Sequence, residues 1–148
     1  TRQGVPVLEH NYDTLEDEVK KGAYIVQDSE KPPELILIAT GSEVSLALET
    51  AKLLKDKNIR VISMPCMEIF EKQSNEYKSS IIPGRGCLKV TIEAGITHGW
   101  EKFLGINGLS VGINHYGASA PGKVLADEFG FTAEKIEARI RDHLKTLL

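Results

Sequence analysis

Thr40, Gly41 and Ser42 stand where this sequence could bind an anion. They follow the apolar run Leu35–Ala39 and precede a helical pattern, and the free amides and dipole of a helix N-terminus favour negative charge. The trio has one glycine, matches neither GxGxxG nor GxxxxGK[ST], and no lysine follows to hold a phosphate. A helix capped by Thr40 and Glu43 in a capping box explains the same residues. Both interpretations stay open from the sequence.

Glu93 and His98 are five residues apart and could form an acid/base pair across one loop. No nucleophile or second carboxylate stands with them, so a glutamate that organises the loop by hydrogen bonds is the simpler interpretation. Ser42 and Ser119 lie beside glycines, but GSE and GAS do not match the GxSxG nucleophile elbow. We therefore assign no catalytic residue from the sequence.

Metal-binding and disulfide patterns are also missing. The four histidines never occur as HxxxH or with a second histidine at ligand spacing, so the sequence predicts no metal site. Cys66 and Cys87 are isolated, without a CxxC pair, which favours two reduced thiols in the core of a cytoplasmic protein.

Size and charge exclude several classes of protein. The 148 residues are 41% hydrophobic and 26% charged, which is typical of one globular domain. The net charge is −3 and no lysine- or arginine-rich run occurs, so we expect no nucleic-acid partner. No apolar run approaches the roughly 20 residues that span a bilayer, and no signal peptide is visible, so we expect no membrane partner.

The elements that would position these residues alternate between strand and helix. Buried apolar runs predict strands, helical spacing predicts helices after residues 40 and 121, and Thr132 predicts the cap of a final helix. The predicted strands are residues 23–27, 35–39, 59–64, 88–92 and 109–113. Such alternation indicates a layered α/β domain, here residues 23–148, preceded by a lead-in segment, residues 1–22. Gly112 indicates a bulge or a close approach of the backbone.

Ligands in open α/β sheets favour the crevice beyond the carboxyl ends of the strands. The loops at residues 40–43, 64–66, 93–98 and 114–119 should therefore lie together. This edge of the sheet is where we expect a site.

Five motifs together resemble the C-terminal region of transketolases. The resemblance covers essentially the whole chain, and the motifs are specific in combination. They are TRQGVP (1–6), ATGSEV (39–44), SMPCMEIFEKQ (63–73), EAGITHGWEKFLG (93–105) and GASAP with a following FGFT (117–132).

The resemblance implies a three-layer α/β/α sandwich around a mostly parallel five-stranded sheet, whose first strand is antiparallel at or near an edge. It implies a homodimeric transferase that moves a two-carbon ketol unit between sugar phosphates in the pentose phosphate pathway. Thiamine diphosphate and a divalent metal, magnesium or calcium, would bind in other domains. The GDG motif that holds them is absent from this sequence.

One site residue is carried over from the resemblance. Arg2 matches the arginine of the family's [ST]RQ motif, at the end of the middle, pyrimidine-binding domain, which binds the substrate's phosphate. A guanidinium suits that task because its fork grips two phosphate oxygens.

We therefore predict a non-catalytic, structural and regulatory domain of a transketolase, inactive and cofactor-free by itself, whose partners are the remaining domains. Two alternatives remain. One is a stand-alone anion- or nucleotide-binding domain that uses Thr40, Gly41 and Ser42. The other is an interaction module that associates through an uncovered apolar face.

Overall fold

A five-stranded sheet forms the centre of the chain, in a computed structural model that describes residues 6–8 and 12–147. The strand order is β1-β3-β2-β4-β5, and only β1 is antiparallel to its neighbour. This confirms the predicted mixed sheet with its first strand antiparallel at an edge. The strands are β1 (Tyr24–Gln27), β2 (Leu35–Ala39), β3 (Ile59–Ser63), β4 (Leu88–Ile92) and β5 (Leu109–Val111).

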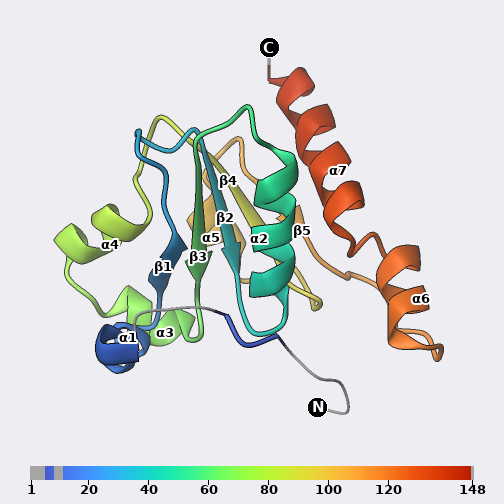
Figure 1. Cartoon of the computed structure of the whole chain (residues 1–148), viewed down its shortest axis with the longest axis horizontal. Helices are drawn as coiled ribbons and strands as arrows, with labels where there is room; N and C mark the ends of the chain where they lie inside the picture. Colours follow the sequence, from blue (N-terminus) through green and yellow to red (C-terminus); the bar gives the residue numbers. More distant parts are fainter. Residues whose placement is uncertain (1–5, 9–11, 148) are drawn as a thin grey trace.

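Helices cover both faces of the sheet, as Figure 1 shows, which confirms the three-layer sandwich. On one face, α2 (Glu43–Leu53) and α7 (Ala133–Thr146) pack against alternate residues of the strands. The other face carries the short helices α3 (Met67–Glu71), α4 (Asn75–Ile81) and α5 (Glu101–Leu104). Every residue of β2 is buried because both faces are covered, which is why its sequence shows no polar alternation.

Two helices lie outside this arrangement. The lead-in segment contains α1 (Tyr12–Val19), a helix of eight residues. After β5 comes α6 (Gly122–Glu128), which is followed by Gly130, where φ is +78°. None of the helices in the described ranges is long and apolar enough to cross a membrane.

The predicted capping box of α2 is wrong. The helix begins at Glu43 with Ser42 as its N-cap residue, and no side chain caps it. Gly41 adopts a φ of +56°, and the Thr40 carbonyl, not its hydroxyl, accepts the Glu43 N–H at 3.2 Å. The glycine turn therefore moves the start of the helix past Thr40. The predicted cap of α7 is confirmed, because the Thr132 hydroxyl accepts the Lys135 N–H at 3.3 Å.

Glycine allows two close backbone approaches. A Cβ on Gly112 would lie 2.4 Å from the Thr97 methyl group, which confirms the predicted close approach. Gly22, just before β1, has a φ of +84°, and a Cβ there would lie 2.5 Å from both the Cys66 carbonyl oxygen and the Phe70 amide nitrogen. This contact holds the start of the sheet against α3.

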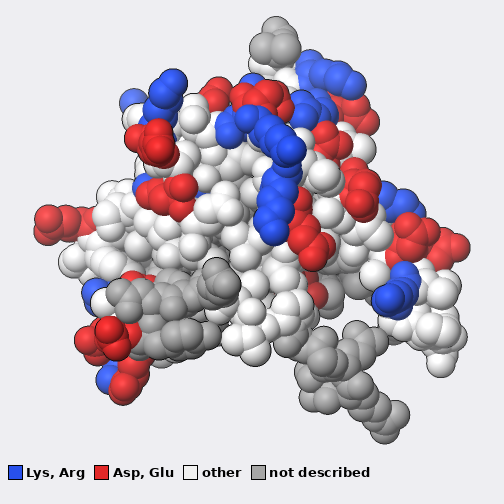
Figure 2. All heavy atoms as spheres, viewed as in Figure 1, with Lys and Arg blue, Asp and Glu red and all other residues white. Residues whose placement is uncertain are grey.

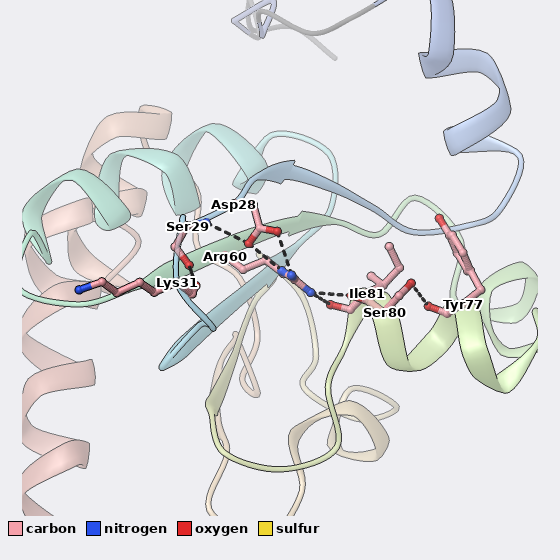
Figure 3. Close-up of polar contacts among 7 residues, drawn as sticks. All are labelled: Asp28, Ser29, Lys31, Arg60, Tyr77, Ser80 and Ile81. Atoms are coloured by element: carbon pink, nitrogen blue, oxygen red, sulfur yellow. Dashed lines mark hydrogen bonds and ion pairs between the residues drawn. The ribbon is translucent and has the colours of Figure 1, made fainter.

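Arg60 on β3 ties β1 to α4, as Figure 3 shows. Its Nε and Nη2 donate to the two carboxylate oxygens of Asp28, at 3.0 and 2.8 Å. Its Nη1 donates to the carbonyl oxygens of Ser80 and Ile81, at 2.6 and 3.0 Å. One mostly buried guanidinium thus joins the end of α4 to the segment after β1.

Candidate functional site

The loops that follow β2, β3 and β4 enclose a hollow of about 470 Å³, which we call the carboxyl-edge hollow. Thr40, Cys66, Glu93 and His98 line it, each from one of the predicted loops. The fourth predicted loop is joined to these through Asn114. Its side-chain oxygen accepts hydrogen bonds from the backbone N–H and the hydroxyl of Thr97, at 3.0 and 3.1 Å. The parallel strands end at the same edge and so bring these loops together, as predicted.

Glu93 is a partly buried acid at this edge. It follows β4 directly, and its Oε2 is buried without a hydrogen-bond partner among the residues that the structure describes. Burial raises the pKa of Glu93, and the charge of Glu43 raises it further. This carboxyl therefore binds a proton more readily than an exposed glutamate.

His98 lines the same hollow but is exposed to solvent. Between the described side chains, no hydrogen bond or ion pair joins His98 to Glu93. The structure thus brings the two groups of the hypothetical acid/base pair to one hollow without pairing them. A catalytic role for the pair has no geometric support.

Cys66 and Cys87 are both free, as expected, but each is only partly buried, so neither is a fully buried core thiol, although Cys87 packs against the core on the α3–α5 face. Cys66 follows Pro65 after β3 and lies at the rim of the hollow. Its Sγ donates to a Glu68 carboxylate oxygen at 3.4 Å. The pKa of Glu68 is lowered, first by its own backbone N–H and then by this thiol. Cys87 lies in the turn before β4, with its Sγ 3.8 Å from a carbonyl oxygen.

The structure divides the candidate anion cradle. Thr40 lines the carboxyl-edge hollow, whereas Ser42 lines a neighbouring hollow with Glu43 and apolar side chains. The Ser42 hydroxyl donates to a Glu43 carboxylate oxygen at 2.9 Å. A carboxylate therefore already occupies the region where an anion would meet the N-terminus of α2, and Glu93 adds negative charge.

Two further predictions concern ligands. Arg2 lies outside the described residues, so its predicted phosphate contact stays a prediction. Within residues 6–8 and 12–147, no three His, Cys, Asp or Glu side chains gather in a way that could hold a metal ion. The expectation that the divalent metal and thiamine diphosphate bind in other domains stays a prediction, and we derive no chemical step through them.

Sequence reasoning missed a second hollow, of about 460 Å³, between α4 and α5. Lys78, Lys89 and Lys102 line it. The one signal in the sequence was Lys89, a charged residue inside the otherwise apolar strand LKVTI. The three lysines are far apart in sequence, so only the fold brings them together.

Comparisons with known proteins agree with the fold and with the motifs. The chain matches the family described as the transketolase-like C-terminal domain over residues 22–132. A transketolase from Staphylococcus epidermidis is 48% identical over 143 residues, which are 95% of this chain and 22% of that protein.

Solved structures give the same result. A transketolase from Leishmania mexicana is 39% identical and has a TM-score of 0.79, over 88% of this chain and 19% of that one. A transketolase variant from Pichia stipitis is 33% identical and has a TM-score of 0.86, over 98% of this chain and 21% of that one. The chain therefore spans about a fifth of the length of these relatives.

Proposed function

Because the chain belongs to the transketolase family, matching its C-terminal domain over residues 22–132, we propose that it serves an enzyme that transfers a two-carbon ketol unit between sugar phosphates. The observation that carries this proposal is the 48% identity to a transketolase over 95% of the chain. The match covers only 22% of that transketolase's length. The corresponding reaction would belong to the pentose phosphate pathway.

Within that enzyme the chain supports catalysis without performing it. Thiamine diphosphate and a magnesium or calcium ion would bind in the preceding domains, since the GDG motif is absent from these 148 residues. The remaining domains and a second copy of the enzyme are its proposed partners. We also place it in the cytoplasm, which its two free cysteines support.

Arg2 is the proposed contact to substrate. It belongs to the motif TRQ at the start of the chain, and an arginine can bind a phosphate group through two parallel hydrogen bonds. Its substitution by lysine should weaken the binding of sugar phosphates in the full-length enzyme, because an ammonium cannot supply the planar fork.

Ketol transfer by reconstituted protein tests this function. The 148-residue chain, the preceding domains without it, and the full-length enzyme are each assayed with thiamine diphosphate, magnesium and sugar-phosphate substrates. We expect turnover from the full-length enzyme and none from the chain alone. Turnover by the chain alone, or a full-length enzyme without ketol transfer, would refute the proposal.

A further inference from the structure

The hollow between α4 and α5 carries a concentrated positive charge, and we call it the lysine hollow after Lys78, Lys89 and Lys102. It lies on the sheet face opposite α2 and α7, and two aromatic rings, Phe70 and Phe103, form part of its wall. Lys89 is the second residue of β4, so the hollow is near the amino ends of the strands. The carboxyl-edge hollow is at the other end.

Lys89 is the innermost of these cations, with 7% of its surface exposed. Its Nζ donates to the Gly84 carbonyl oxygen at 3.2 Å. An ammonium has three N–H donors. Among the described residues, no carboxylate forms an ion pair with the Lys89 ammonium. Burying an unpaired charge is costly, and an anion that entered the hollow would offset this cost by pairing with Lys89.

The other two lysines converge on Glu71 at the end of α3. The Nζ of Lys102 lies 2.8 Å from the Glu71 carboxylate, and the Nζ of Lys78 donates to the Glu71 carbonyl oxygen at 3.2 Å. Three ammonium groups and one carboxylate leave a charge of +2 on the lining. The whole chain has a net charge of −3, and on the face in Figure 2 the two signs are interspersed, so this excess is local.

We propose that the lysine hollow binds a small molecule with at least two negative charges, namely inorganic phosphate or a phosphate monoester. Its volume of about 460 Å³ suits a compact ligand. Lysines bind phosphate as point charges from several directions, which matches three ammonium groups on separate elements. The aromatic wall would contact the apolar part of a monoester. This site goes beyond the proposed ketol transfer and is independent of it.

Calorimetric titration of the 148-residue chain with inorganic phosphate and, separately, with phenyl phosphate tests the site. We expect saturable binding. The ligand with the higher affinity shows whether the hollow prefers inorganic phosphate or a phosphate monoester. Lys89→Met, which keeps an apolar stem, should weaken binding about tenfold or more, the effect of losing a charge-assisted hydrogen bond. Lys123→Gln is the matched control, because Lys123 is an exposed lysine of α6 outside the hollow.

Two further variants keep the test decisive if Lys89→Met fails to fold. Lys102→Gln should weaken binding of either ligand. Glu71→Gln should strengthen it, because it removes the only carboxylate among the described lining residues and releases Lys102. Circular dichroism checks that each variant is folded. Absence of saturable binding, or equal affinities for wild type, Lys102→Gln and Glu71→Gln, would overturn the proposal, while ketol transfer by the full-length enzyme would remain unaffected.

Discussion

Replacement of Arg60 tests whether one side chain holds the edge of the sheet to α4 (Figure 3). Its side chain is 12% exposed, whereas that of its partner Asp28 is 42% exposed. Arg60→Met retains the length of the stem and removes all four hydrogen bonds. Asp28→Asn removes the negative charge but leaves the two carbonyl contacts at the end of α4 intact.

The expected magnitudes follow from these exposures. Each lost hydrogen bond to a backbone carbonyl costs about 1 kcal/mol. The ion pair with half-exposed Asp28 adds about 1 kcal/mol or less, because solvent screens it. We therefore expect Arg60→Met to lower the free energy of unfolding by about 3 kcal/mol, and Asp28→Asn by about 1 kcal/mol or less.

Urea denaturation followed by far-ultraviolet circular dichroism measures both changes. Arg85→Met is the matched control, because Arg85 is an exposed arginine in the turn before β4, and we expect a change within about 0.5 kcal/mol. A value for Arg60→Met within that same range would refute the reasoning. So would a loss for Asp28→Asn equal to that for Arg60→Met, since the ion pair would then account for the whole effect.

Three smaller perturbations separate competing explanations. Thr132→Ala should lower the free energy of unfolding by about 1 kcal/mol, because it removes a capping hydrogen bond, whereas Ser42→Ala should have almost no effect in the same chemical denaturation. Gly22→Ala should lower the free energy of unfolding by about 3 kcal/mol, because φ is positive there and the new Cβ would clash with two backbone atoms. Gly41→Ala should lower it by about 1 kcal/mol in thermal melts, because φ is also positive but the space around the Cβ is open. Burial raises the pKa of Glu93, so the folded state binds its proton more tightly, and stability falls as the pH rises from the unfolded to the folded pKa. Glu93→Gln should therefore gain stability relative to wild type as the pH rises through that window, and an equal difference at acidic and neutral pH would contradict this.

The sequence predicts the central strands well because their burial leaves a simple pattern. β2 and β4 occupy the predicted residues, since both faces of each strand are covered and every position is apolar or buried. The predicted ends of β3 and β5 extend too far, because apolar residues continue past the ladder into the loops. Met64, for example, is 2% exposed and donates to a β2 carbonyl oxygen, yet it lies outside β3.

The site could be predicted only in part. Parallel strands end at one edge, so the convergence of the loops follows from topology alone. The exposure of Cys66 and the unpaired carboxyl of Glu93 depend on how the loops turn after Pro65 and Gly95, which no periodicity reveals. The boundary between the lead-in segment and the domain stays a prediction, as does the role of Arg2.

Charge decides which end of this sheet can receive an anion. Helix N-termini and strand carboxyl ends usually favour anions, and this led us to Thr40, Gly41 and Ser42. Here the carboxylates of Glu43 and Glu93 lie at that edge, and the pKa of Glu93 is raised first by burial and then by the charge of Glu43. A phosphate there would add a further negative charge, whereas in the lysine hollow it would meet an excess of two positive charges. We therefore expect this domain to depart from the general rule for α/β sheets, because side-chain charges outweigh the partial charges of one helix terminus.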